Sequence, residues 1–342
     1  MIGSHIDTVP SGGRYDGIAG VIASLCVIKH IKDNNINLPF NLSVYDYLGE
    51  ELNDWGISCI GTRGMIGALN EEILSRSNSS GNVLKDEINK IGGNSRSLDR
   101  PLPMIENILA CLELHIEQGK ILEQKNIEIG IVRSIPSISR FNVEVNGQAG
   151  HSGTILMDQR ADALVVSSEI ITYVNKLALK LSKESNQHFV STIGKINVYP
   201  NAAAIIPGKV EMTIDLRASS KSSRQQYITE LEKQIEDINK TSSCRIEINE
   251  IAYAPYVEMD KELVKLFKKS ADASGLSSQI MDSGAGHDTA QLSRVAPASM
   301  IFIPCKDGLS HCPEEHAEIL DISKGTAVLF NMLENLADSN QI

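Results

Sequence analysis

Four strand patterns and two long amphipathic helix patterns alternate between residues 136 and 252. The strands show apolar residues at every second position, and the helices show the spacing of one apolar helical face. Their order is strand, helix, strand, strand, helix, strand, over 139–145, 158–183, 191–198, 209–217, 222–240 and 244–250. This is the split β-α-β order of an open-faced α+β (βαββαβ) sandwich. The block therefore predicts an independent domain inserted into a larger one.

The segments on either side of this block alternate shorter strand patterns with helices. Residues 18–33 predict a buried helix with a basic end, and 322–338 predict a closing helix. Strands are expected at 41–47, 110–116, 127–133 and 298–304. Such alternation is typical of an α/β domain. We therefore expect two domains, 1–135 with 253–342 and 136–252, in agreement with a length of 342 residues.

Composition excludes several classes of function. A net charge of −11 and the lack of any Lys/Arg-rich run argue against nucleic acid and anionic membranes as partners. No apolar run reaches the roughly 18 residues of a membrane span. The six cysteines are scattered without a CxxC pair, so we expect free thiols in a reducing compartment, the cytoplasm.

A His and an Asp flank a loop of turn formers close to the first residue. His5 precedes the segment 9–14, which contains Pro10 and two glycines, and Asp16 follows it. Such a loop can fold back and bring imidazole and carboxylate together, and these groups bind divalent ions such as zinc. Asp7 could hold the second ring nitrogen of His5. The alternative is a glycine-rich turn with a surface histidine.

Three further candidate ligands follow predicted strands or lie in glycine-containing loops. Glu50 and Glu51 follow the strand at 41–47, His115 ends the strand at 110–116, and His311 follows the strand at 298–304. Singly, a glutamate pair is usually solvated surface and a lone histidine usually belongs to the core. Together with His5 and Asp16, these residues suit two divalent ions that share one carboxylate and activate water, with Glu50 as general base.

The start of the sequence is unusual for such a site. Only Met1 and Ile2 precede the metal loop, although a ligand loop normally hangs from a longer strand. We expect that the chain lacks its natural beginning and at least one strand. The alternative is a short edge strand with a frayed end.

A series of short motifs runs across the whole chain. The motifs are Gly-Ser-His-Ile-Asp-Thr-Val-Pro at 3–10, Gly-Gly-Arg-Tyr-Asp-Gly at 12–17, Glu50-Glu51, Glu-Leu-His-Ile-Glu-Gln-Gly at 113–119, Gly-His-Ser-Gly-Thr at 150–154, Met157 with Arg160 and Asp162, Asp215-Leu-Arg217, Gly-Ala-Gly-His-Asp at 284–288 and Leu-Ser-His-Cys-Pro-Glu-Glu at 309–315. In these motifs the chain resembles the M20 metallopeptidase clan. The match is closest to its amidohydrolase branch, which includes N-carbamoyl-L-amino-acid hydrolase, β-ureidopropionase, allantoate amidohydrolase and ureidoglycolate amidohydrolase.

The resemblance implies an α/β catalytic domain with a mixed sheet flanked by helices, and two divalent metal ions in each subunit. The ions would be zinc or manganese, with cobalt or nickel as alternatives. Asp16 would bridge them, His5 and His115 would complete one site, and Glu51 and His311 would complete the other.

The resemblance also implies catalytic roles. Asp7 would orient His5, and Glu50 would activate the bridging water. The inserted domain would be a lid and dimerisation domain of a homodimer, and His151 would stabilise the oxyanion in the partner subunit.

The resemblance also implies three residues that contact the substrate. Arg217 would bind the substrate carboxylate, since its planar fork suits that group, and Gln118 and His287 would line the pocket. The implied reaction is hydrolysis of a ureido or carbamoyl C–N bond, which converts an N-carbamoyl amino acid into an amino acid, ammonia and carbon dioxide.

The sequence departs from the family in ways that keep two alternatives open. Ala204 stands where the family usually has Asn, so one substrate hydrogen bond is expected to be absent. A dipeptidase or aminoacylase of the same clan is the first alternative. The second is a catalytically silent fragment or binding protein.

Overall fold

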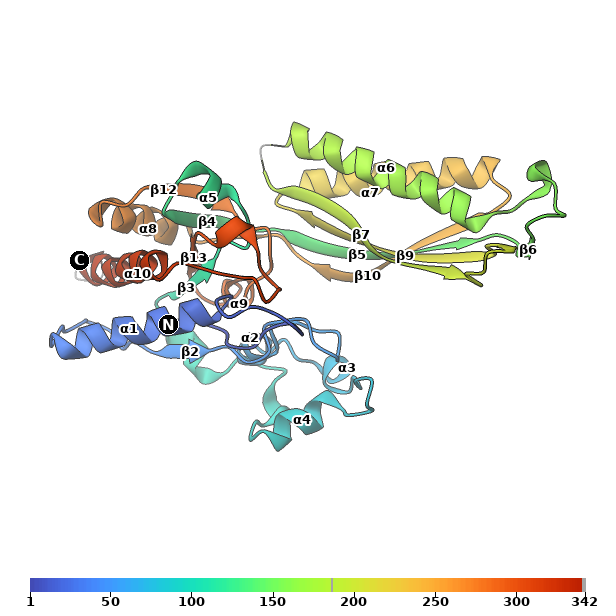
Figure 1. Ribbon diagram of the computed structural model, residues 1–342. Coiled ribbons are helices and arrows are strands. Elements are labelled where there is room, and N and C mark those ends of the chain that lie inside the picture. The colour runs from blue at the N-terminus through green and yellow to red at the C-terminus, as the bar shows by residue number, and fades with distance from the viewer. Residues whose placement is uncertain (186, 340–342) are drawn as a thin grey trace. The chain divides into compact units, whose positions relative to one another are not determined.

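The computed structural model describes residues 1–185 and 187–339 (Figure 1). It divides into unit 1, which comprises Met1–Ile135 and Glu258–Ile342, and unit 2, which comprises Pro136–Val257. The second boundary lies after Val257 rather than after residue 252, because β10 (Arg245–Ala254) extends beside β5 (Ser137–Asn146) beyond residue 250.

Unit 1 is built on a seven-stranded mixed sheet. The strand order is β11-β4-β13-β3-β1-β2, and β12 also pairs with β4. The central strands run in parallel from β13 through β3 and β1 to β2, whereas β13 and β4 are antiparallel. The strand bounds are Ile2–Ser4 (β1), Val44–Asp46 (β2), Cys111–Ile116 (β3), Ile129–Ile135 (β4), Val257–Glu258 (β11), Ser278–Asp282 (β12) and Ala298–Ile303 (β13). The predicted mixed sheet is confirmed.

Helices lie on both faces of this sheet. The Leu114 side chain packs on Gly325 of α10 (Ile319–Ser339). The next residue back, Glu113, bonds to Thr289 of α9 (Asp288–Leu292). Because successive strand residues point to opposite faces, α9 and α10 cover opposite faces of β3.

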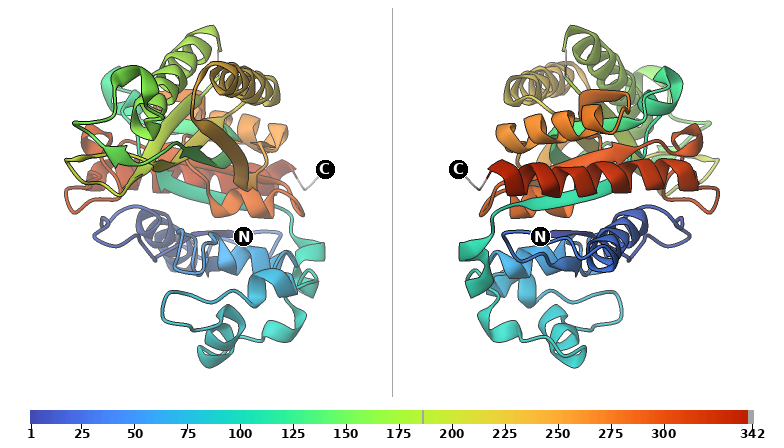
Figure 2. Two further views of the ribbon diagram at one scale, coloured as in Figure 1. Left: turned by 90° about the vertical axis from the view of Figure 1, so that its right-hand side faces the viewer. Right: turned by 90° about the vertical axis from the view of Figure 1, so that its left-hand side faces the viewer.

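Three long helices lie side by side on the α10 face (Figure 2). They are α1 (Ile18–Asp33), α8 (Lys261–Ala273) and α10, and α1 has the bounds that the sequence predicts. A methyl group on Gly20 would lie 2.0 Å from the Leu114 carbonyl oxygen, so glycine allows α1 to approach β3 closely. The remaining helices of unit 1 are α2 (Ile60–Met65), α3 (Glu71–Leu74), α4 (Leu84–Lys90), α5 (Ile121–Lys125) and three short 3-10 helices, η1 (Ser95–Ser97), η2 (Pro103–Asn107) and η4 (Lys306–Gly308).

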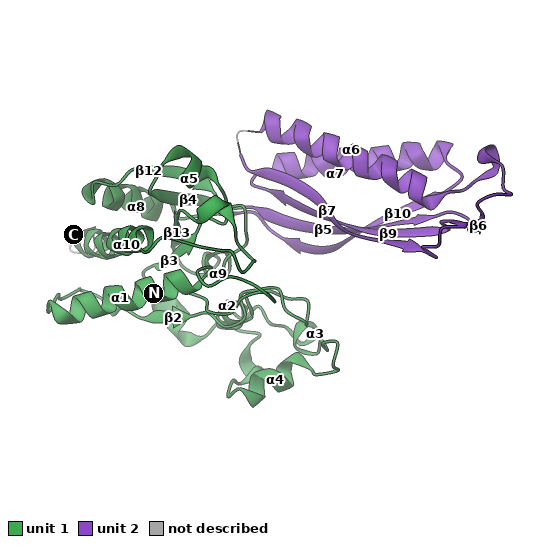
Figure 3. Ribbon diagram, viewed as in Figure 1, with its two compact units in different colours: residues 1–135, 258–342 green, residues 136–257 purple. Residues whose placement is uncertain are grey.

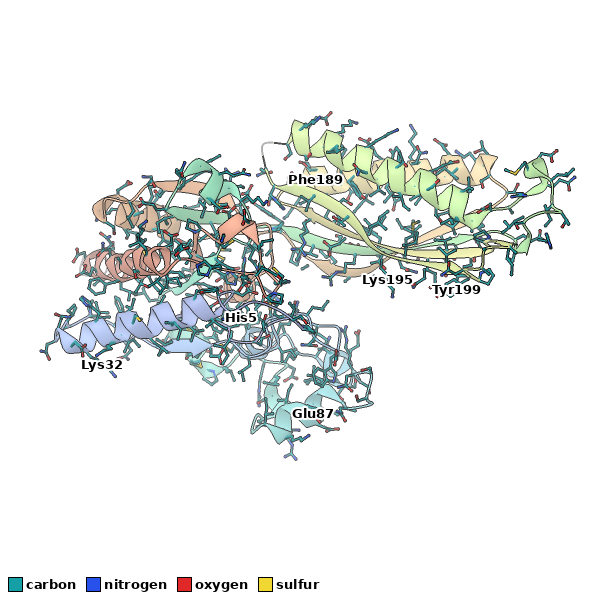
Figure 4. The ribbon with its side chains drawn as sticks, in the orientation of Figure 1. His5, Lys32, Glu87, Phe189, Lys195 and Tyr199 are labelled. Carbon is teal, nitrogen blue, oxygen red and sulfur yellow. The ribbon has the colours of Figure 1, made fainter. Side chains whose placement is uncertain are left out.

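Unit 2 is an antiparallel sheet of order β10-β5-β9-β7 with two helices on one face (Figure 3). Buried residues alternate with more exposed ones along β5 and β9, as a sheet covered on one face requires. Phe189 and Tyr199, labelled in Figure 4, mark the ends of β7. The remaining bounds are Lys209–Ala218 (β9), Ala163–Glu184 (α6), Lys221–Thr241 (α7), Gly150–His151 (β6), Ile205–Ile206 (β8) and Met157–Gln159 (η3, a 3-10 helix).

Two general features of the chain complete the description. Among the helices of the described residues, none combines the length and apolar character needed to cross a membrane. All six cysteines are free, as the sequence predicts.

Candidate metal centre

The candidate ligands lie where parallel strands of unit 1 end. β1 pairs in parallel with both β2 and β3, so the three strands end at one edge of the sheet. His5 directly follows β1, Glu50 and Glu51 lie in the loop after β2, and His115 is the next to last residue of β3. Figure 4 labels His5, which lies near the start of α1.

His5, Asp16 and His115 form a first group of potential metal ligands. All three are buried, and one ligand atom of each lies within 4.8 Å of the other two. The Asp16 Oδ1 lies 3.2 Å from the His115 Nε2. Two imidazoles and a carboxylate suit zinc and related divalent ions.

Asp16, Glu51 and His311 form a second group with the same spacing. The His311 Nε2 lies 3.4 Å from the Asp16 Oδ2 and 3.0 Å from the Glu51 Oε1. Asp16 therefore belongs to both groups, with Oδ1 near His115 and Oδ2 near His311. A carboxylate placed in this way can bridge two ions.

Two carboxylate oxygens in the second group support a cation there. Asp16 Oδ2 and Glu51 Oε1 are buried and make no hydrogen bond within the described residues, although His311 is close. A buried polar atom without a partner costs about 1–3 kcal/mol. Because both oxygens and the His311 nitrogen lie within 4.8 Å of one another, a bound cation would satisfy all three. The residues therefore fit a pair of divalent ions.

The second ring nitrogens of the buried histidines are held by backbone carbonyls. The His5 Nδ1 lies 2.9 Å from the Asp7 carbonyl oxygen, and the His115 Nδ1 lies 2.9 Å from that of Ile116. A donating Nδ1–H leaves the Nε2 lone pair available for a metal.

Asp7 also connects two loops of the centre. Its carboxylate oxygens accept hydrogen bonds from the backbone N–H groups of Glu50 and Glu51, each at 3.1 Å. Its Oδ1 lies 3.5 Å from the His5 Nδ1. Asp7 therefore fixes the glutamate pair relative to His5.

Glycine at position 17 makes room for the His5 ring. A methyl group on Gly17 would lie 2.3 Å from the His5 Cδ2 and 2.5 Å from its Nε2. Any larger residue at the start of α1 would displace the imidazole. The glycine of the predicted loop motif thus has a packing role at the ligand.

Mutual attraction dominates the electrostatics of the ligands. The nearby carboxylates of Asp16 and Glu51 raise the pKa of His311 to about 10. Burial opposes ionisation of both Asp16 and His5. Even so, the proximity of His311 and the charges of the other histidines lower the pKa of Asp16 well below its usual range. Asp7 and nearby carboxylates raise the pKa of His5 to about 10.

Glu50 differs from these ligands in its surroundings. Its side chain is buried, and its Oε1 lies 3.5 Å from the Cys59 Sγ. Burial, together with the charges of Glu51 and Glu113, raises the pKa of Glu50 to about 8. A carboxyl group that titrates near neutrality is suited to accept and return a proton.

Gln118 and His287 also lie among the ligands. The Gln118 Nε2 donates to the Asp16 Oδ1 at 2.9 Å and lies 3.4 Å from the His311 Nε2. Gln118 and His311 both adopt positive φ angles, 56° and 58°, which is uncommon for residues other than glycine and is often found at functional sites. His287 is buried, with its ring centre 4.7 Å from that of His115.

His151 and Arg217 belong to unit 2. His151 is exposed on β6, and its Nδ1 accepts a hydrogen bond from the Gly153 N–H at 3.0 Å. The Arg217 Nε on β9 donates to the Asp215 Oδ1 at 3.1 Å. The Ala204 carbonyl oxygen accepts from the Ser152 N–H at 3.0 Å, so position 204 supports the His151 loop through its backbone.

Two buried carboxyl groups near the centre are missed by sequence reasoning. Glu113 lies within 4.8 Å of His115 and His287. This third group does not resemble a free metal site, because Ser4 and Thr289 already donate to Glu113. Asp288 is fully buried and bonds to Thr62. Both residues lie in the motifs at 113–119 and 284–288. The one sequence feature that could have drawn attention to them is their closeness to the candidate histidines His115 and His287.

The chain is similar to known proteins over nearly its whole length. A model of the peptidase family M20/M25/M40 matches residues 1–335. The chain is 35% identical over 336 residues to an N-carbamoyl-L-amino-acid amidohydrolase of Pseudomonas sp. (strain NS671), covering 97% of this chain and 80% of the relative. It is 34% identical to the allantoate amidohydrolase of Bacillus subtilis (strain 168), covering 98% and 81%. The crystal structure of a hydantoinase/carbamoylase family amidase from Burkholderia multivorans has a TM-score of 0.85 at 32% identity, covering 98% of this chain and 80% of that one.

Proposed function

The chain belongs to the peptidase family M20/M25/M40, and from this premise we propose that it is a metal-dependent amidohydrolase. It cleaves a ureido or carbamoyl C–N bond of a small carboxylate substrate. The names of the amidohydrolase relatives support this substrate class. The observation that carries the proposal is Asp16, whose two oxygens face two groups of metal ligands.

These two groups would hold divalent ions, zinc or manganese, in the proposed enzyme. His5 and His115 would be ligands of one ion, Glu51 and His311 would be ligands of the other, and Asp16 would serve both. When bound, such ions supply an acidified water and stabilise negative charge on the substrate oxygen.

Glu50 moves the proton in the proposed reaction. It takes a proton from the attacking water and delivers it to the departing nitrogen, a role open to a buried carboxylate that is not itself a proposed ligand. Asp7 holds the Glu50 backbone, so the carboxylate keeps its position beside the ligands. For an N-carbamoyl amino acid, the products are the amino acid, ammonia and carbon dioxide.

Unit 2 is proposed to act as a lid and as the dimerisation domain of a homodimer. Arg217 binds the substrate carboxylate with a guanidinium that Asp215 orients. His151, supplied by the partner subunit, stabilises the oxyanion, while Gln118 and His287 contact the substrate. A cytoplasmic location is part of the proposal and agrees with the free cysteines.

A substrate panel tests the proposal. Ammonia release is measured with allantoate, N-carbamoyl-β-alanine, N-carbamoyl-L-amino acids and ureidoglycolate, with dipeptides assayed in parallel. We expect turnover of at least one ureido or carbamoyl compound and two bound ions in metal analysis. Turnover of dipeptides alone would assign the chain to a peptidase activity instead.

The variant Glu50→Gln tests the general base. The amide keeps the shape of the side chain but cannot accept the proton, so we expect kcat to fall by about 10²–10⁴-fold. Metal content should stay at the wild-type value, because Glu50 is not a proposed ligand. A variant that keeps both its ions and its rate would show that another group accepts the proton.

A further inference from the structure

Glu315 is a buried carboxylate beside the metal centre that has no assigned role. It lies in the loop after β13, is 3% exposed, and forms no ion pair among the described residues. Burying a charged carboxylate without a cation is costly unless hydrogen bonds compensate. The contacts of Glu315 therefore indicate what it stabilises.

Three donors surround this carboxylate. The Oε1 accepts hydrogen bonds from the backbone N–H groups of Tyr15 and Asp16, at 2.8 and 3.0 Å. The Oε2 accepts from the Ser310 hydroxyl at 2.8 Å. Glu315 thus joins the loop that carries Asp16 to the loop that carries His311.

Gln118 closes these contacts into a ring. Its Nε2 donates to the Ser310 Oγ at 3.1 Å and to the Asp16 Oδ1 at 2.9 Å. The Ser310 hydroxyl can donate its single hydrogen to Glu315 while it accepts from Gln118. The backbone and the carboxylate of Asp16 are therefore both held by the same network.

The ring stabilises strained backbone. His311 and Gln118 both have positive φ angles, and such residues persist only where their surroundings hold them. His5 and His115 have their own backbone acceptors, whereas His311 is exposed and depends on its loop. Loss of Glu315 should therefore disturb the His311 side of the centre most.

Gly13 provides the space for Glu315. A methyl group at position 13 would lie 2.0 Å from the Glu315 Oε1. Any side chain at position 13 would occupy the space of the Glu315 carboxylate, so this position requires glycine.

We infer that Glu315 is a positioning residue for the second metal ion, the one held by Asp16, Glu51 and His311. The inference rests on the proposed function, since it requires that the centre binds two ions. Glu315 belongs to neither group of potential ligands, so we do not assign it as a ligand itself. It acts through the backbone at Asp16 and through Ser310.

Calorimetric titration of the metal-free full chain with Mn²⁺ alone tests the inference. The wild type should bind two ions. In Glu315→Ala we expect the first ion to bind with nearly unchanged affinity and the second to bind about 10–100-fold more weakly, the range found when partners of metal ligands are removed. The matched control is Glu314→Ala, an exposed neighbour that should bind both ions as the wild type does.

Three results would overturn these conclusions in different ways. A wild type that binds no ion contradicts the proposed function itself. Two ions of wild-type affinity in Glu315→Ala contradict the role of Glu315. Equal weakening of both ions contradicts its assignment to the second site.

If circular dichroism shows that Glu315→Ala is unfolded, two further variants test the same inference. Ser310→Ala removes one link of the ring, and Gly13→Ala pushes on the carboxylate from the other side. Each should weaken the second ion selectively, and unchanged binding of both ions in both variants would overturn the inference. Glu315→Gln keeps an acceptor for the backbone N–H groups and should restore part of the affinity.

Discussion

Two buried carboxyl groups of unit 1 have opposite hydrogen-bonding surroundings. Glu113 accepts from the Ser4 hydroxyl, the Thr289 hydroxyl and the Thr289 N–H. Within the part of the chain that the structure describes, the Asp288 Oδ1 accepts from the Thr62 hydroxyl and the buried Oδ2 has no partner. A buried carboxyl group that receives one such hydrogen bond favours its protonated form.

The variant Asp288→Asn tests this assignment through the pH dependence of stability. Burial and the charges of Glu50 and Glu113 raise the pKa of Asp288 well above its usual value. The unfolded carboxyl ionises near pH 3.9 while the folded one keeps its proton, so the free energy of unfolding falls as pH rises. Asparagine does not ionise, so the variant lacks this fall in the free energy of unfolding. We expect the decrease between pH 5 and pH 8, measured by urea unfolding with chelator, to be smaller by about 1 kcal/mol or more.

Glu314→Gln is the matched control for Asp288→Asn, because Glu314 is exposed. This variant should follow the wild-type pH dependence. An Asp288→Asn variant whose stability falls with pH as steeply as the wild type would mean that Asp288 is ionised in the folded protein.

At the residue scale, sequence reasoning finds side chains that share a metal but not those that support them. His5, Asp16 and His115 follow predicted strands or flank a turn, and strand ends meet at one sheet edge. Glu315 lies inside a quoted motif, yet its role depends on Tyr15 and Ser310, which only the folded chain brings together. Hydrogen-bond networks of this kind have no periodicity in the sequence.

At the element scale, two motif residues of the inserted unit have structural roles. The Asp162 carboxylate accepts from the Leu164 and Val165 N–H groups and caps α6. The Arg160 guanidinium donates to the Ser152 and Ile155 carbonyl oxygens and so closes the loop that carries His151. Family motifs therefore mix residues that stabilise elements with residues proposed for chemistry.

The variant Asp162→Ala should destabilise unit 2. Loss of an N-cap side chain typically costs about 0.5–2 kcal/mol, and α6 is one of the two helices that cover this sheet. Urea unfolding followed by far-ultraviolet circular dichroism measures the change. The control Asp158→Ala alters an exposed aspartate in the preceding 3-10 helix and should leave the midpoint unchanged. Equal midpoints for both variants would contradict the capping role.

The long elements are predictable from the sequence, and short-range turns are less so. The helix expected at 222–240 is observed as α7, and the strand expected at 209–217 is observed as β9. The pair Asn146-Gly147 is typical of a hairpin turn, but no hairpin forms there. β5 pairs with β9 and β10 instead, and the Gly147 N–H donates to the Gly208 carbonyl oxygen at 2.8 Å. Distant strand pairing overrides the local turn preference there.

At the scale of the whole molecule, sheet order is the feature that sequence patterns leave open. β13 pairs with β3 in parallel and with β4 in antiparallel orientation, and it lies between these two strands. Alternating apolar residues specify which face of a strand is buried but not which strand lies next to it. The clustering of His311 with Asp16 depends on this order, since His311 follows β13.

The division into two units makes the stabilising effect of metal testable by region. All proposed ligands lie in unit 1, which also contains Trp55, the single tryptophan of the sequence. An ion that binds only the folded state stabilises it by about 2.7 kcal/mol at a hundredfold excess over Kd. Mn²⁺ should therefore raise the melting temperature reported by Trp55 fluorescence by several degrees, and chelator should reverse the shift. Because unit 2 has its own core, part of the circular dichroism transition, that of α6 and α7, should stay in place. In His5→Ala the Trp55 shift should shrink, and an undiminished shift would place the stabilising ion elsewhere.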